Sequence, residues 1–405
     1  MAFPVGGRIA EASKARVRKG SLLRGADLRI LLDQATVGDI ALRLRETSYA
    51  AVLKDAALEG SSLEDIRRGE LEFLLNVSVL AEGMTFRHYA NLGDRKMLDL
   101  WLESFDVALI KNHLQFSMNE AEGERLSPDR ILGIVSDFRL TLVDQEKLLS
   151  GSSLRDLLAS VRRDSLREAL FEGIPPGSGS AFAERGPEFQ KTMFALGMIL
   201  DRCYFDSLYA AASALSGEEG RMMRVLVGTR IDLLNLYWIY RARRFFGMPP
   251  EEALTLILKA RYRVNFELLT KAAFAPPSAF ASTLEGTPYA AVFGGPEVPR
   301  ESQEETASGE GAALREVAVE CRLYKLLLAV ANRIFMSGTL GFQNVAAYLT
   351  LREFEVRDII AIVETVRYGF DKSKTDLILI NAQAQGGEAR SPESGLTGLP
   401  ETPVV

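Results

Sequence analysis

An aspartate recurs at equal intervals inside long apolar segments of this 405-residue chain. Asp106 lies in FDVALIKNHLQF, Asp232 in IDLLNLYWIYRARRF and Asp358 in RDIIAIVETVRYGF, and both gaps are 126 residues. Each segment has helical periodicity and follows a turn signal: NLGD, LSGEE or SGTLGFQN. These matches predict three long helices at equivalent positions of a repeat, and Ser216 with Glu219 is predicted to form a capping box at the second.

The sequence upstream of each aspartate also recurs in a fixed order. TSYAAVL at 47–53 is matched by TPYAAVF at 287–293, and DSLREALF at 164–171 occupies the intermediate position. In front of them lie three apolar helical segments that each contain a leucine pair: ILLDQATVGDIALRLRE, KLLSGSSLRDLLASVRR and ELLTKAAFAPPSAFASTLE. Three copies of one helical module explain this order. The predicted copies are residues 1–119, 120–247 and 248–381, followed by a tail, 382–405.

The length of the repeat restricts the architecture. A copy of more than a hundred residues is too long for tetratricopeptide, HEAT or ankyrin units, so a solenoid is not expected. Strict strand-type alternation is rare, and 47% hydrophobic residues are enough to bury several cores. We therefore expect an all-α fold of three helical lobes related by a pseudo-threefold axis, which form a funnel with a central hollow.

Three segments interrupt the helical pattern. Residues 173–187 and 294–311 are rich in Pro, Gly and Ser and are predicted to be long surface loops. Residues 382–405 contain too few large apolar side chains to offset the entropy of ordering, so a disordered tail is predicted.

Composition and charge exclude several classes of protein. A net charge of −6 without a basic stripe argues against a nucleic-acid binder. Two cysteines, Cys203 and Cys321, favour a reducing compartment without a disulfide framework. No signal-peptide pattern occurs at the N-terminus, and the most apolar run, LYKLLLAVANRIFM, is shorter than a membrane span. A soluble protein, or one peripheral to a membrane, is expected.

Catalytic motifs are missing from the sequence. No glycine-rich stretch is followed by the Lys-Ser or Lys-Thr of a phosphate-binding loop, so no nucleotide site is predicted. The two histidines, His88 and His113, lack neighbouring ligands for a zinc site, and no Asp-rich run resembles the metal cluster of a prenyl synthase. We therefore predict no catalytic residue, no cofactor and no metal.

Asp232 and Asn235 share one side of their helix, which is otherwise apolar. A carboxylate among apolar neighbours is costly unless it is hydrogen-bonded or paired. One interpretation is that Asp232 bridges helices inside its own lobe, for example to Arg230 or Arg202. The other is that it locks adjacent lobes together. Either structural role is favoured over catalysis, because no second catalytic group lies nearby.

The same helix is predicted to end sharply. Arg241, Arg243 and Arg244 suit the partially negative C-terminus of a helix, and Gly247 suits a left-handed cap. Two prolines then prevent continuation. Arg241 is also a candidate for contact with a partner, so the residues expected to serve structure or coupling are Asp106, Asp232, Asn235, Arg241 and Asp358.

Two stretches carry a resemblance to a known family. IDLLNLYWIYRARRFFGMPPEE and KARVRKGSLLRGADLRILLDQATVGDIALRLRETSYAAVL resemble segments of the C subunit of the archaeal and bacterial A/V-type rotary ATPases, the counterpart of the d subunit of the eukaryotic V-ATPase. The resemblance covers residues 12–381 and includes the three-copy organisation. The family's aromatic pair before Ala-Arg-Val-Arg is missing. Only the second copy has the Asp and Asn pair, because Leu109 and Ala361 occupy the matching positions.

The resemblance implies a non-catalytic rotor protein. Such a protein links the central stalk subunits to the membrane ring of proteolipid subunits, on the cytoplasmic face, and transmits torque. It is expected to bind neither nucleic acid nor nucleotide and to be monomeric when isolated. The alternative is a helical scaffold that binds partner helices in a concave surface. An all-α enzyme is the third hypothesis.

Overall fold

The computed structural model describes residues 4–58, 62–116, 126–138, 140–150, 154–174, 187–294, 309–370, 372, 375 and 378–381. Within these ranges the regular elements are helices, with a single isolated bridge between Val143 and Val161. The predicted all-α fold is confirmed. The predicted tail, 382–405, lies outside the described residues, as do 175–186 and 295–308 of the two predicted loops.

Both loops were predicted to be longer than they are, because helices extend into them. Gly294 ends one helix and Gly309 begins the next, while Pro187 is the first residue of another. A proline is tolerated in the first helical turn, since its missing N–H has no partner there in any case.

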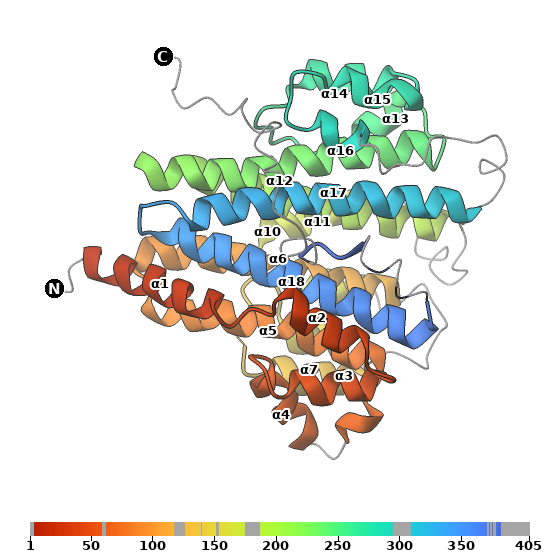
Figure 1. Ribbon diagram of the computed structural model, residues 1–405. Helices are drawn as coiled ribbons and strands as arrows, with labels where there is room; N and C mark the ends of the chain where they lie inside the picture. The colour runs from red at the N-terminus through yellow and green to blue at the C-terminus, as the bar shows by residue number, and fades with distance from the viewer. Residues whose placement is uncertain are drawn as a thin grey trace.

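Six long helices form the framework of the described residues, in three consecutive pairs. They are α5 (Arg68–Tyr89) and α6 (Leu92–Phe116), α11 (Pro187–Ala214) and α12 (Gly217–Arg244), and α17 (Gly309–Phe335) and α18 (Phe342–Tyr368). Short turns join the two members of each pair. Figure 1 shows these helices lying across the middle of the molecule in roughly one direction.

A group of short helices precedes each long pair. The three groups are α2 (Gly25–Leu32), α3 (Val37–Leu44) and α4 (Ala50–Leu58); α8 (Gln145–Ser150), α9 (Leu154–Ser160) and α10 (Asp164–Glu172); and α14 (Phe266–Phe274), α15 (Phe280–Thr283) and α16 (Ala290–Gly294). Before these groups come α1 (Pro4–Lys19), α7 (Pro128–Val135) and α13 (Pro250–Thr255), and two 3-10 turns lie at Leu63–Asp65 and Pro277–Ala279. The predicted repeat limits, 1–119, 120–247 and 248–381, and the predicted funnel with a hollow stay predictions.

The long pairs pack on one another in a continuous series. Helix α6 contacts α11, α12 contacts α17, and α18 contacts α5. Helix α18 also contacts α1, α2 and α3, so the last long helix lies against the first elements of the chain, as Figure 1 shows.

The buried apolar side chains form two cores among the described residues. The larger extends through the second and third long pairs and includes Trp101, Leu196, Leu236 and Tyr348. The smaller unites α2 to α5 with the C-terminal half of α18, through residues such as Leu28, Ile40, Leu71, Ile359 and Val363. The second core therefore depends on segments from opposite ends of the chain.

The ends of α12 test two local predictions. Gly247 has φ 58°, the left-handed conformation predicted for the cap, and Arg243 Nη1 donates to the carbonyl oxygen of Met248 at 2.7 Å. The predicted capping box is wrong, because Ser216 makes no side-chain cap bond. Glu219 Oε1 instead accepts a hydrogen bond from the backbone N–H of Phe342 at 2.8 Å, across to the start of α18.

No helix in the described part of the chain is both long and apolar enough to cross a membrane.

Candidate functional site

Asp106 lies inside α6 and is 2% exposed. Its Oδ2 accepts a hydrogen bond from the backbone N–H of Leu142 at 2.7 Å, and the backbone N–H groups of Thr141 and Val143 also point to it. Burial raises the pKa of Asp106 to about 7, because the backbone donors offset only part of the desolvation of the charged carboxylate. The side chain thus fixes the segment that leads into α8.

Asp232 lies inside α12 and is fully buried. It accepts backbone hydrogen bonds from Tyr262 at 3.0 Å, Arg263 at 2.7 Å and Val264 at 3.2 Å. The hydroxyl of Tyr289 donates to the same carboxylate at 2.9 Å. Burial raises the pKa of Asp232 and these donors lower it. Its role is to hold the segment before α14.

The predicted arginine partners of Asp232 are wrong. Arg230 pairs with Glu353 of α18 at 3.1 Å, and Arg202 Nη2 donates to the carbonyl oxygen of Thr255 at 2.7 Å. Backbone donors replace them because residues 262–264 return close to α12. That approach needs Gly228, where a Cβ would lie 2.5 Å from Cγ of Tyr262.

Asn235 lies one turn after Asp232 and holds an adjacent part of the same returning segment. Its Oδ1 accepts from the backbone N–H of Leu258 at 2.7 Å, and its Nδ2 donates to the carbonyl oxygen of Ala260 at 3.4 Å. Its amide supplies both a donor and an acceptor, which a carboxylate could not do.

Asp358 lies inside α18 and is 1% exposed. It accepts from the backbone N–H of Ile380 at 2.7 Å and of Asn381 at 2.9 Å, and from Nδ2 of Asn381 at 2.8 Å. Burial raises its pKa, and these donors lower it. The three predicted aspartates therefore lie in three separate places, each holding a different segment that follows its own helix.

Arg241, near the end of α12, forms an ion pair with Glu316 of α17. Its guanidinium also lies over the rings of Tyr237 and Phe246, at 5.5 and 5.8 Å from the centroids. The Phe246 side chain is 66% exposed, so this end of α12 presents an arginine and an aromatic ring at the surface.

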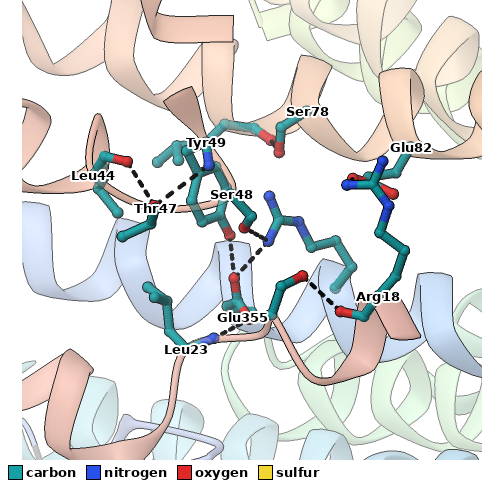
Figure 2. Close-up of polar contacts among 12 residues, drawn as sticks. Arg18, Leu23, Leu44, Thr47, Ser48, Tyr49, Ser78, Glu82 and Glu355 are labelled. Carbon is teal, nitrogen blue, oxygen red and sulfur yellow. Dashed lines mark hydrogen bonds and ion pairs between the residues drawn. The ribbon is translucent and has the colours of Figure 1, made fainter. Parts of the chain in front are cut away.

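A buried polar cluster on α18 was missed by the sequence analysis. Glu355 accepts from the backbone N–H of Leu23 at 2.8 Å and from the hydroxyl of Tyr49 at 2.7 Å, as Figure 2 shows. Arg352 Nη1 donates to Glu355 and to Oγ of Ser48, both at 2.8 Å. Its guanidinium also stacks on the ring of Tyr49, 3.7 Å from the centroid. This cluster ties α18 to the N-terminal group of helices.

The repeated Thr-x-Tyr sequence was the signal that could have found it. Thr47 Oγ1 donates to the carbonyl oxygen of Leu44 at 2.6 Å and accepts from the N–H of Tyr49 at 3.3 Å. Thr287 makes the same two bonds, to Leu284 at 2.7 Å and from Tyr289 at 3.2 Å. Two tyrosines held alike by a threonine turn are expected to have alike partners.

The chemistry of these sites is structural. Each carboxylate accepts donors that come almost entirely from the backbone, and no group of three His, Cys, Asp or Glu suited to a metal ion occurs in the described part of the chain. Buried acceptors of this kind anchor a segment, because releasing it would leave several backbone N–H groups unpaired.

Comparison with known proteins gives the family. The sequence model of the ATP synthase (C/AC39) subunit matches residues 12–376. The chain belongs to this family. Residues 12–376 contain the C/AC39 framework of long helices and all the interior carboxylates described above.

Two relatives of the C/AC39 chain are archaeal, and both are C subunits of an A-type ATP synthase. The chain is 23% identical to the one from Methanobrevibacter smithii over 375 residues, which are 92% of this chain and 88% of that protein. It is 28% identical to the one from Methanosphaera stadtmanae over 155 residues, 37% of this chain and 36% of that protein.

Proposed function

We propose that this C/AC39 chain is a non-catalytic rotor protein that links the central stalk of a V/A-type rotary ATPase to the membrane ion ring and transmits torque. The observation that carries the proposal is the family match over residues 12–376, together with relatives named as C subunits of A-type ATP synthases. In this proposal the three groups of helices form a funnel on the cytoplasmic face of the ring, and its hollow receives the foot of the stalk.

Torque transmission requires stiffness against twisting, and the ties between helix pairs would supply it. The second and third pairs are joined by Arg230 to Glu353, by Arg241 to Glu316 and by Glu219 to the N–H of Phe342. Close-packed interiors transmit strain, whereas loose ones absorb it. Interior carboxylates that pin the returning segments to the long helices would stiffen each group further.

The five predicted site residues have distinct roles in this proposal. Asp106, Asp232 and Asp358 each hold a segment against a long helix, and Asn235 extends the second of these anchors. Arg241 braces α12 against α17 and reaches the surface beside an exposed ring, where a protein of the stalk or of the membrane ring can contact it.

The test is reconstitution of the rotary complex with and without this chain. We expect complexes that contain it to pump ions in proportion to ATP hydrolysed, and complexes without it to hydrolyse ATP with little pumping. The isolated chain should be monomeric, should not hydrolyse ATP and should co-purify with the central stalk subunits. Equal pumping per ATP without the chain would contradict the proposal and favour a helical scaffold.

A further inference from the structure

The segment before each group of short helices is held by a carboxylate on a long helix. Val143, Val264 and Leu23 each lie two residues before the first helix of a group, α8, α14 or α2. Asp106 of α6 accepts from the segment that contains Val143, and Asp232 of α12 accepts from the segment that contains Val264. The acceptor for Leu23 is Glu355 of α18, at 2.8 Å.

The tyrosines show the same correspondence. Tyr289, in the third group, donates its hydroxyl to Asp232 at 2.9 Å, and Tyr49, in the first group, donates to Glu355 at 2.7 Å. Both tyrosines are buried, and both are held by a threonine turn. Glu355 therefore makes both kinds of contact that Asp232 makes.

Asp358 then corresponds to Asn235. Each lies three residues after a carboxylate of the kind just described, and each holds the chain that leaves its own helix: Leu258 and Ala260 for Asn235, Ile380 and Asn381 for Asp358. Equal spacing in sequence thus pairs Asp358 with Asp232, whereas the contacts pair Glu355 with Asp232.

Apolar packing follows the same order. Helix α12 contacts α13 and α14 of the group that comes after it in the chain. Helix α18 has no later group, and it packs on α2 and α3, so that Val356, Ile359 and Ile362 complete the core that contains Leu28 and Ile40. The first group occupies the place of a group that would follow α18.

We propose that the three helix groups form a head-to-tail cycle, that Glu355 closes its third joint, and that this joint is where the cycle opens. The α18 joint is the contact of Leu23 and Tyr49 with Arg352 and Glu355. Residues joined at this contact are 332 apart in the chain for Leu23 and Glu355, against 36 for Leu142 and Asp106 and 31 for Arg263 and Asp232. Opening the α18 joint releases much more conformational freedom, because no short connection retains the first group.

The α18 joint is also the one that contains a buried charge pair. Arg352 is 1% exposed, and its Nε and Nη2 have no hydrogen-bond partner, while the other two anchors are filled by backbone N–H groups. A buried ion pair adds little net stability over an apolar contact, and unpaired buried donors reduce it further. Chain connectivity and polar satisfaction thus indicate the same weak joint.

Hydrogen exchange on the whole chain tests this inference, and the test does not depend on the rotary role. The backbone amides of Leu23, Leu142 and Val264 are matched probes, one at each joint. In wild-type protein, we expect residues 25–58 to exchange through an opening that needs less denaturant than the openings of 145–172 and 266–294. The opposite order, or one common opening of all three groups, would overturn the proposal.

Glu355→Gln makes the test specific. This substitution should raise exchange at Leu23 and across 25–58 by at least about tenfold, and should leave the amides of Leu142 and Val264 unchanged. The matched control is Glu353→Gln, also on α18, whose carboxylate pairs with Arg230 of α12 instead. It should not affect 25–58. Equal effects of the two variants on 25–58, or no effect of Glu355→Gln, would also overturn the proposal.

Discussion

At the scale of single residues, the interior polar groups act as anchors for distant backbone. Asp232 satisfies three consecutive backbone N–H groups and a tyrosine hydroxyl, so its removal exposes four donors to an apolar interior. A buried donor left without an acceptor costs about 1–3 kcal/mol. The number of dependent donors, more than the charge itself, makes this side chain important.

Asp232→Ala should lower the free energy of unfolding by about 3 kcal/mol or more, because several backbone donors near Val264 lose their acceptor. Urea unfolding followed by circular dichroism measures it. Asp33→Ala is the control, since the Asp33 side chain is 78% exposed and should change stability by no more than about 0.5 kcal/mol. Similar losses in the two variants would exclude an anchoring role.

Asp106 should make stability depend on pH. Burial raises its pKa from 3.8 to about 7, so the folded state binds a proton more tightly than the unfolded state. Its contribution is therefore full below about pH 4 and is lost as pH rises through about 7, with a slope of at most about 1.4 kcal/mol per pH unit. Asp106→Asn removes the titration, so wild-type stability should fall relative to this variant between pH 4 and 8. A difference that is constant or rises with pH would contradict the assignment.

At the scale of elements, the close return of a segment to its long helix is decided by small residues as well as by polar ones. Gly228 lies one turn before Asp232 in α12 and leaves room for the Tyr262 backbone and ring. Without that space the N–H groups of 262–264 could not reach the carboxylate. A glycine inside a helix has low helix propensity, and here the close contact compensates for it.

Gly228→Ala should destabilise the protein by about 1–3 kcal/mol, although alanine is the better helix former, because its Cβ would lie 2.5 Å from Tyr262. Thermal unfolding of the variant is the measurement. The comparison is Gly338→Ala, in the turn before α18, where nothing lies within 4 Å of the added Cβ and no change is expected. A stabilised Gly228→Ala variant would show that the segment does not pack as closely as described.

At the scale of the whole molecule, the first and last parts of the chain depend on each other. The smaller core joins α2 to α5 with α18, and the buried cluster around Glu355 lies at the same contact (Figure 2). A closed cycle needs no special chain ends, so the position of the termini should be interchangeable with one of the connections between groups.

A circular permutant tests that statement. Its chain begins at residue 126, runs to 381, continues through a flexible linker of about 20 residues to residue 4, and ends at 116. We expect its helical circular dichroism to match that of the native order, and Glu355→Gln to lower its melting temperature less than it does in the native order, because the linker retains the first group. Loss of helical signal, or an equal loss from Glu355→Gln in both chains, would contradict a cycle.

Sequence by itself determined the local features of this C/AC39 chain. Helical periodicity, the left-handed Gly247 at the end of α12 and the position of Asp232 inside an apolar helix all follow from residues within a few turns of each other. The recurrence of Thr-x-Tyr at 47–49 and 287–289 was visible as well, since a repeat retains the residues of its turns. Such features depend on neighbours along the chain.

Only the tertiary structure decided which groups the buried side chains contact. Asp232 binds backbone donors 30–32 residues away and not Arg230 or Arg202, while Glu219 reaches Phe342 across 123 residues and makes no box with Ser216. The exchange of roles between Asp358 and Glu355 has the same cause. A buried carboxylate takes whichever donors the returning backbone brings within about 3 Å, and that approach is set by the packing of whole helices, which periodicity within one segment does not encode.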